Sequence, residues 1–112
     1  MPLNLADLAA KTVALSIPFG DETIKAEYRP YKMTPKFRAL LIQLDKGIGE
    51  DQKTAVAEML AQMLAGWDVV NDGEPYPPTY DNLIEVPIEL LSAAADAVWA
   101  DLGKRMTTGI EG

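Results

Sequence analysis

The chain has 112 residues, of which 48% are hydrophobic and 24% are charged, as is usual for one soluble globular domain. Its formal net charge of -7 would repel phosphate backbones and its basic residues are scattered, so nucleic acid is not an expected partner. The sequence has no cysteine and no histidine, which excludes disulfides, thiolate or imidazole catalysis and most zinc, copper and haem sites.

No apolar run in the sequence approaches the roughly 20 residues that a membrane-spanning helix needs. The first residues, "MPLNLADLAAK", lack the basic start and the long apolar centre of a secretion signal. We therefore expect a cytoplasmic protein with no membrane partner. We expect a single domain over residues 1–112, in which residues 1–10 form an N-terminal segment ahead of the first regular element.

Residues 11–30 predict a β-hairpin, because apolar side chains alternate along both arms. The alternating residues are Val13, Leu15, Ile17, Ile24, Ala26 and Tyr28. A type II′ turn at Gly20-Asp21 would place all six on one face. Pro18 has no N–H to donate, so its strand should lie at the edge of the sheet. Since an isolated hairpin is only marginally stable in water, helices should cover its apolar face.

Residues 34–105 predict a helical part. The first helix should begin at Thr34-Pro35, where threonine caps the helix and proline takes the first helical position. Its inner stripe is Phe37, Leu40, Leu41, Leu44 and Ile48, and its end is marked by Gly47 and Gly49. The second helix should begin near Glu50 or Asp51 and pack against the first as an antiparallel helical hairpin. Its inner stripe is Val56, Met59, Leu60, Met63, Leu64 and Trp67.

Two more helical segments are expected near the C-terminus. Thr79 should cap a short turn that runs to Ile84, and Pro87 should open a final helix that reaches about Arg105. The inner stripe of this helix is Ile88, Leu91, Ala95, Val98 and Leu102, widened by Leu90, Ala94 and Trp99. Residues 106–112 should form a flexible tail. Together these elements predict an α+β fold, an N-terminal β-hairpin packed on a small bundle of three main α-helices.

Residues 66–83, "GWDVVNDGEPYPPTYDNL", form an unusual connection between two of these helices. Asp68 to Gly73 is similar to the start of an EF-hand calcium loop. The match fails because Val70 stands where an oxygen ligand is needed and Thr79 stands where a bidentate glutamate is needed. A turn fits better, since the Asn-Asp-Gly sequence tolerates positive φ and the prolines that follow favour an extended return. We therefore predict an irregular connection with no metal.

No catalytic residue and no cofactor is predicted. Ser16 and Ser92 lack the Gly-x-Ser-x-Gly elbow, and the chain has no histidine to activate either of them. Acidic residues are expected on solvated helix faces and turns, where charge usually serves solubility; they are Asp45, Glu50, Asp51 and Glu58. The sequence also has no glycine-rich phosphate loop. We therefore expect a protein that is not an enzyme.

Surfaces for partner proteins are the remaining functional candidates. Met59, Met63 and Trp67, together with Trp99, supply the polarizable and aromatic side chains that adaptable binding surfaces use. The same spacing is typical of core packing, so burial in the core is an alternative for the first three. The edge of the hairpin offers a second route, strand addition to a client or to another copy of the chain, which would give a homo-oligomer.

The segment "LAGWDVVNDGEPYPPTYDNLIEVPIELLSAAADAV" resembles the tail assembly chaperones of long-tailed phages and prophages. The shared pattern is a Trp-Asp at a helix end, a turn with glycine, a proline-rich return to a helix cap and a proline before the last helix. Its positions here are Trp67, Asp68, Gly73, Pro77, Thr79, Leu83, Pro87 and Leu91. Upstream, "IPFG", "AEYRP" and the Thr-Pro helix start occur in the same order, so the resemblance covers roughly residues 12–102.

The resemblance implies a non-catalytic assembly factor of viral tail morphogenesis. Such chaperones bind the tape measure protein, help the tail tube protein to polymerise around it, act in the host cell cytoplasm and are generally absent from the virion. Many families also make a longer form by ribosomal frameshifting, which a protein sequence does not reveal. The alternative is a small structural virion protein, such as a tail completion or neck subunit.

Overall fold

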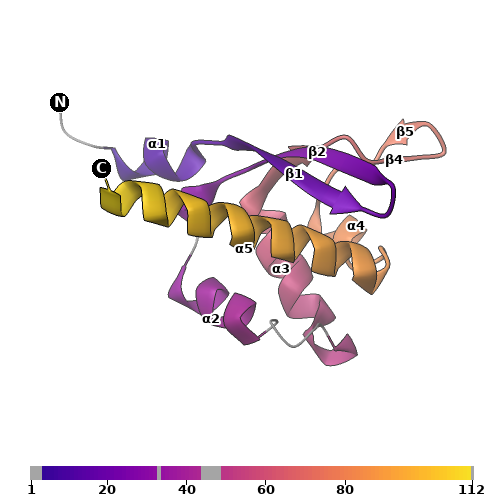
Figure 1. Ribbon diagram of the computed structural model, residues 1–112. Helices are drawn as coiled ribbons and strands as arrows, with labels where there is room; N and C mark the ends of the chain where they lie inside the picture. Colours follow the sequence, from indigo (N-terminus) through magenta and orange to yellow (C-terminus); the bar gives the residue numbers. More distant parts are fainter. Residues whose placement is uncertain (1–3, 33, 44–48, 112) are drawn as a thin grey trace.

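The computed structural model describes residues 4–32, 34–43 and 49–111, with the backbone alone at 50 and 105–111 (Figure 1). The fold is α+β, as predicted from the sequence. In chain order the elements are α1 (Leu5–Ala10), β1 (Val13–Phe19), β2 (Glu22–Tyr28), the 3-10 turn η1 (Pro30–Lys32), α2 (Pro35–Gln43), the 3-10 turn η3 (Glu50–Gln52), α3 (Lys53–Met63), β3 (Leu64–Trp67), β4 (Val70–Asn71), β5 (Glu74–Pro75), α4 (Tyr80–Leu83) and α5 (Ile88–Glu111).

The hairpin of β1 and β2 has the predicted register. Ile17 pairs with Ile24, and Leu15 pairs with Ala26. Gly20 has φ +62, whereas Asp21 is not among the described non-glycine residues with positive φ. Positive φ at the first turn position alone is the pattern of a type II′ turn. The turn therefore determines which side chains point inward, because a shift of the pairing by one residue would move all of them to the other face.

The strand β3 corrects the predicted end of the second helix. The sequence pattern assigned Leu64 and Trp67 to that helix, but the helix ends at Met63 and the next four residues form a strand. Leu64, Gly66 and Trp67 pair antiparallel with β2, and a register shift skips Ala65. Within the described residues the sheet order is β1-β2-β3. The helical spacing was misleading because both side chains point inward from the strand as they would from a helix. Gly66 disfavours continuation of the helix, since glycine in a helix interior costs about 1 kcal/mol relative to alanine.

The junction of α3 and β3 is bonded directly to the residue that follows β2. The Arg29 N–H donates to the Met63 carbonyl at 2.7 Å. The Arg29 guanidinium donates to the carbonyls of Gln62 at 3.0 Å and Leu64 at 3.3 Å. These carbonyls lie at a helix end, where a cation is favoured by the helix dipole and the carbonyls need donors. Arg29 therefore stabilises the end of α3 and fixes where β3 begins.

The core lies between the sheet and a layer of helices. In Figure 1, α5 runs along β1, and α3 packs against α5 and α4. Tyr28 is completely buried, and its hydroxyl donates to the carboxylate of Asp101 on α5. The buried residues are Leu15, Ile17, Ala26, Tyr28, Phe37, Leu41, Val56, Ala57, Met59, Leu60, Met63, Leu64, Leu83, Val86, Leu90, Leu91, Ala94, Ala95, Val98 and Leu102.

The helices α1, α2 and α3 agree only in part with the starts and ends expected from the sequence. The N-terminal segment contains the helix α1, which is capped by the side chain of Asn4. The helix α2 begins as predicted, with the Phe37 N–H donating to Thr34 Oγ1 at 3.2 Å. The predicted second helix begins with a 3-10 turn and becomes α-helical at Lys53. Leu44, Gly47, Ile48 and the predicted link between the two helices lie outside the described residues.

The helix α5 begins directly after Pro87, as predicted, and continues to Glu111. The predicted end near Arg105 was too early, because no proline follows to stop the helix and the backbone of residues 106–111 stays helical. Leu90 and Ala94 widen the buried face as expected. Trp99 does not, since 41% of its surface is exposed.

We predict that Leu60→Ala lowers the free energy of unfolding by about 2–5 kcal/mol, because the substitution leaves a cavity at a fully buried position. Leu5→Ala is the matched control, since Leu5 is 74% exposed and its truncation should change stability by less than about 0.5 kcal/mol. Urea denaturation followed by circular dichroism measures both. Equal losses for the two variants would contradict the assignment of the core.

Candidate partner-binding surface

The connector after β3 is a second, very short hairpin. Val70 pairs with Pro75, and Asn71 pairs with Glu74. Asp72 has φ +53 and Gly73 has φ +80, so both turn residues lie in the left-handed region, as a type I′ turn requires. The predicted chain reversal at Asn-Asp-Gly is confirmed. The segment is more regular than the irregular connection that was predicted, because β4 and β5 form a two-residue ladder.

Side chains join the two ends of this connector. The Trp67 indole N–H donates to the Tyr76 carbonyl, and the Tyr76 hydroxyl donates to the Asn82 carbonyl at 2.9 Å. The side-chain amide of Asn82 donates to the Pro77 carbonyl at 2.8 Å. The Asn82 N–H also donates to Thr79 Oγ1 at 3.4 Å, which is the predicted helix cap. The chain from the end of β3 to the start of α4 is thus tied into one hydrogen-bonded loop.

Asp68 extends the pairing of β2 with β3 by one position. Its N–H donates to the Lys25 carbonyl at 3.0 Å, and its carboxylate accepts the Lys25 N–H at 3.0 Å. Farther along the chain, the Pro87 carbonyl accepts the N–H groups at the start of α5, and Gly73 supplies the positive φ of the turn. The residues of the family pattern therefore act as caps, turns and strand ends.

The structure separates the four side chains that the sequence offered as a partner-binding face. Met59 and Met63 are completely buried, so the alternative of core packing describes them and they are not accessible to a partner. Trp67 is half-buried and bonded within the connector. Trp99 is exposed on α5. The stripe failed as a binding face because its helix is covered by α4 and α5.

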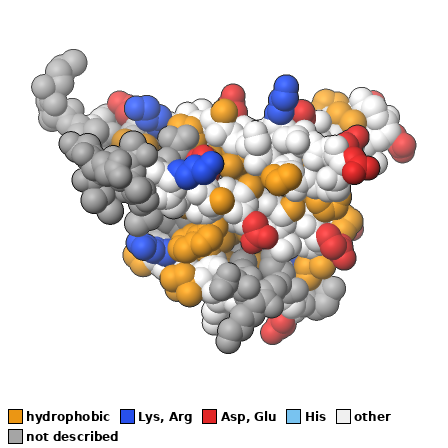
Figure 2. All heavy atoms as spheres, viewed as in Figure 1, with side chains coloured by type: hydrophobic (Ala, Val, Ile, Leu, Met, Phe, Trp, Pro, Cys, Tyr) orange, Lys and Arg blue, Asp and Glu red, His pale blue; other side chains and the backbone are white. Residues whose placement is uncertain are grey.

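A groove between α2 and α3 is lined by apolar side chains together with Lys36, Gln43 and Glu58. Its volume is about 380 Å³, and Phe37, Ala39 and Leu40 provide its wall on α2. Ala55 and Glu58 provide the opposite wall on α3. Figure 2 shows hydrophobic side chains at the surface in the lower left of the view, where Figure 1 places α2.

Ile42 is an exposed apolar residue of α2 that does not line this groove and was not singled out in the sequence. It is 59% exposed, and it lies three residues from Ala39, which places it on the adjoining helix face. The sequence could have predicted the exposure of Ile42, because this residue falls outside the inner stripe that Phe37 and Leu41 define. A large apolar residue off the stripe of an amphipathic helix is expected at the surface.

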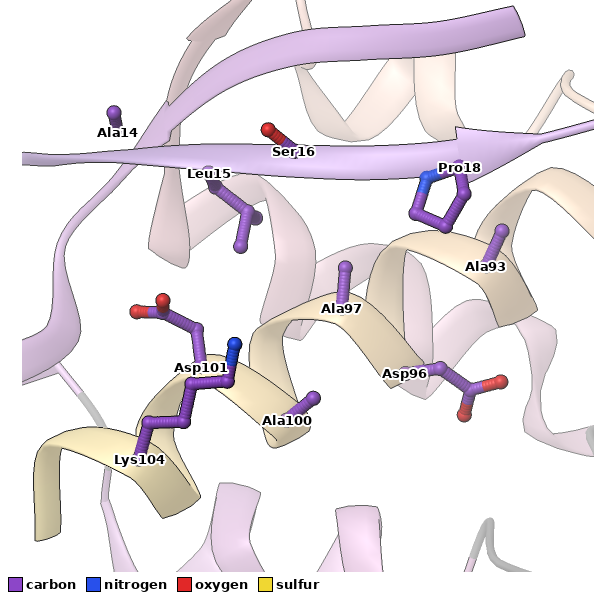
Figure 3. Close-up of a pocket in the computed structure, with 10 residues that line it drawn as sticks. All are labelled: Ala14, Leu15, Ser16, Pro18, Ala93, Asp96, Ala97, Ala100, Asp101 and Lys104. Atoms are coloured by element: carbon purple, nitrogen blue, oxygen red, sulfur yellow. The ribbon is translucent and has the colours of Figure 1, made fainter. Parts of the chain in front are cut away.

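A second groove lies between β1 and α5 and has a volume of about 610 Å³ (Figure 3). Its lining is mostly small side chains, from both elements. They are Ala14, Ser16 and Pro18 of β1 and Ala93, Ala97 and Ala100 of α5. Asp96, Asp101 and Lys104 supply the charges. A third depression, near the tip of the first hairpin, is lined in part by Phe19 and Val70.

The described serines and acidic side chains were the remaining candidates for chemistry. Ser16 is exposed on a strand and Ser92 lies on α5, and the sequence supplies no histidine for either. Among the described residues, no group of three or more acidic side chains is placed to hold a metal ion. In the same part of the chain, no helix is long and apolar enough to cross a membrane. What the surfaces offer is packing area and backbone hydrogen bonding.

Comparison with protein-family models, with characterised proteins and with solved structures gives no match to this chain.

We predict that Asp68→Ala lowers the free energy of unfolding by about 0.5–1.5 kcal/mol, because the Lys25 N–H loses its acceptor at a partly exposed position. Asp68→Asn keeps an oxygen acceptor and should lose less. Amide hydrogen exchange of Lys25, followed by NMR, should accelerate in the alanine variant and stay closer to the original rate in the asparagine variant. The same exchange rate in both variants would show that the carboxylate does not hold this strand end.

Proposed function

We propose that the protein is a tail assembly chaperone of a long-tailed phage or prophage, which binds the tape measure protein and promotes assembly of the tail tube without catalysis. The proposal rests on the resemblance of residues 12–102 to that family, carried by the order of strands, turns and caps. The pattern residues Trp67, Asp68 and Thr79 lie in one hydrogen-bonded connector, which is consistent with a shared fold. We further propose that it acts in the host cell cytoplasm.

The groove between α2 and α3 is the observation that best supports binding of such a client. A long helical client exposes apolar stripes before assembly, and an amphipathic helix docks by laying its apolar side chains into a groove of this kind. Phe37 and Leu40 give the groove apolar side chains, and the exposed Ile42 adds apolar surface on the adjoining face of α2. Exposed apolar side chains that gather on one helix often mark an interaction site.

The acidic surface is compatible with the same role. With a formal net charge of -7, copies of the protein repel one another, which keeps a protein with exposed apolar side chains soluble. The charge would also disfavour binding to the nucleic acid that surrounds phage assembly in the cell. A chaperone needs both properties, because it must hold an aggregation-prone chain without aggregating itself.

Ile42→Glu and Ala39→Glu should each weaken binding of the tape measure protein by about tenfold, because each places a charge where apolar side chains of the client would be buried. Both positions are exposed, so the free energy of unfolding should change by less than about 0.5 kcal/mol. Co-expression with the tape measure protein from the same genome, followed by affinity purification and measurement of the soluble client, gives the readout.

Val70→Glu is the matched control for these variants. Val70 is 60% exposed, compared with 59% for Ile42, and it lies on β4 at the opposite end of the molecule from α2 (Figure 1). The control should leave the amount of soluble client unchanged. Equal effects of all three variants would show that α2 is not the client site, and no binding by the original protein would overturn the proposed function.

The chaperone role also predicts where the protein is found. Mass spectrometry of purified virions should detect the tail tube and tape measure proteins but not this chain, whereas the lysate of infected cells should contain it. A fixed number of copies in each purified virion would instead support the alternative, a tail completion or neck subunit. Copies per particle can be counted against the tail tube protein in the same sample.

A further inference from the structure

We infer that the open edge of β1, together with the groove beside it, binds an extended segment of another protein by strand addition. The segment would have small or β-branched apolar side chains at alternate positions and at least one basic residue. The inference is independent of the proposed function, because it depends only on β1, α5 and the groove between them.

The backbone of β1 points unused hydrogen-bonding groups toward this groove. Lys25 pairs with Ser16, yet both the N–H and the carbonyl of Lys25 bond to Asp68 on the other side of β2. The pair is therefore one of the non-hydrogen-bonded pairs of an antiparallel ladder, and the backbone groups of Ser16 point outward. By the same alternation those of Ala14 point outward too, and Pro18 adds a carbonyl but no N–H. These three residues also line the groove.

β1 has no charged side chain that would protect its open edge, and Pro18 protects it only near one end. Edge strands are commonly guarded by charged side chains that discourage pairing with another chain. On the solvent face of this sheet, the charges stand on the central strand at Lys25 and Glu27. The edge strand carries Ala14, Ser16 and Pro18, which are small and uncharged. Only the missing N–H of the proline limits pairing, and it does so at one end.

The groove provides room for the side chains of an added strand. Alternate side chains of that strand would point toward α5, where Ala93, Ala97 and Ala100 form a shallow floor (Figure 3). The alanines leave space that valine-sized side chains would fill, and burial of each would contribute apolar contact area. A helix would gain less here, because its own backbone groups are already paired and cannot bond to the strand.

The occupant is better described as a foreign extended segment than as a second copy of this chain. A second copy would present its own β1, whose inward side chains Leu15 and Ile17 are already buried against its own helices. It would have no side chains left to fill the groove. Two carboxylates, of Asp96 and Asp101, line the groove against one ammonium group, of Lys104. The chain as a whole is also acidic, and both facts favour a basic residue in the added segment.

The test uses 15N-labelled full-length protein and the synthetic peptide TVKVTVKV with blocked ends as the probe. Titration should shift the NMR signals of Ala14, Ser16 and Ala97, and should slow the hydrogen exchange of the Ala14 and Ser16 amides. Two methylated peptides are matched controls. Methylation of the threonine and lysine amides should abolish binding, because these residues share the face of Ser16 and direct their N–H groups to β1. Methylation of the valine amides should be tolerated.

Three protein variants complete the test. Ser16→Pro removes one outward N–H as Pro18 already does, and should weaken binding about tenfold, whereas Ser16→Thr should bind like the original protein. Ala100→Leu fills the groove and should also weaken binding, while thermal unfolding confirms that each variant is folded. The inference would be overturned if the peptide bound equally well to Ser16→Pro and Ala100→Leu, or if the NMR signals of β1 did not shift on titration. A dimer that Ser16→Pro dissociates would overturn it in favour of self-pairing.

Discussion

The pairing of β3 with β2 is the constraint on which the remaining architecture depends. It fixes the end of α3, because the strand begins at the residue after the helix and Arg29 bonds to the carbonyls on either side of that junction. At the other end, Asp68 bonds to both backbone groups of Lys25. With both ends held, α3 must lie across the inner face of the sheet, where its buried stripe meets α5 and α4.

The same pairing decides which surfaces are left for partners. Since β2 is paired on both sides, β1 and β3 carry the two edges of this sheet in the described part of the chain, and β1 is the longer of them. The contact of α3 with the rest of the core takes Met59 and Met63 away from the surface. Apolar side chains that remain exposed then belong to elements at the periphery, such as Ile42 on α2 and Trp99 on α5. Two candidate grooves therefore lie on opposite sides of α5, one formed with β1 and one on the α2 side.

Residues 66–83 form a connector that is held by local hydrogen bonds and turns. Trp67, Tyr76 and Asn82 hold the ends of the connector, and Gly73 permits its turn. Each requirement is local and chemical: an indole N–H needs an acceptor, and positive φ favours glycine. Such a pattern preserves a shape. The pattern therefore supports a fold more directly than it supports a binding face.

The sequence by itself determined the elements whose signals are local. The type II′ turn at Gly20 fixed the register of the first hairpin, and Thr34, Thr79 and Pro87 marked helix starts, because each acts on backbone groups within a few residues. Only the tertiary structure decided that residues 64–67 form a strand and that the methionines are buried. Helical spacing accepts Leu64 and Trp67 on one face, whereas a regular strand would point them to opposite faces. A register shift in the pairing with β2 lets Leu64 lie opposite Tyr28 and Trp67 opposite Ala26, and this pairing involves residues that lie far away in the chain.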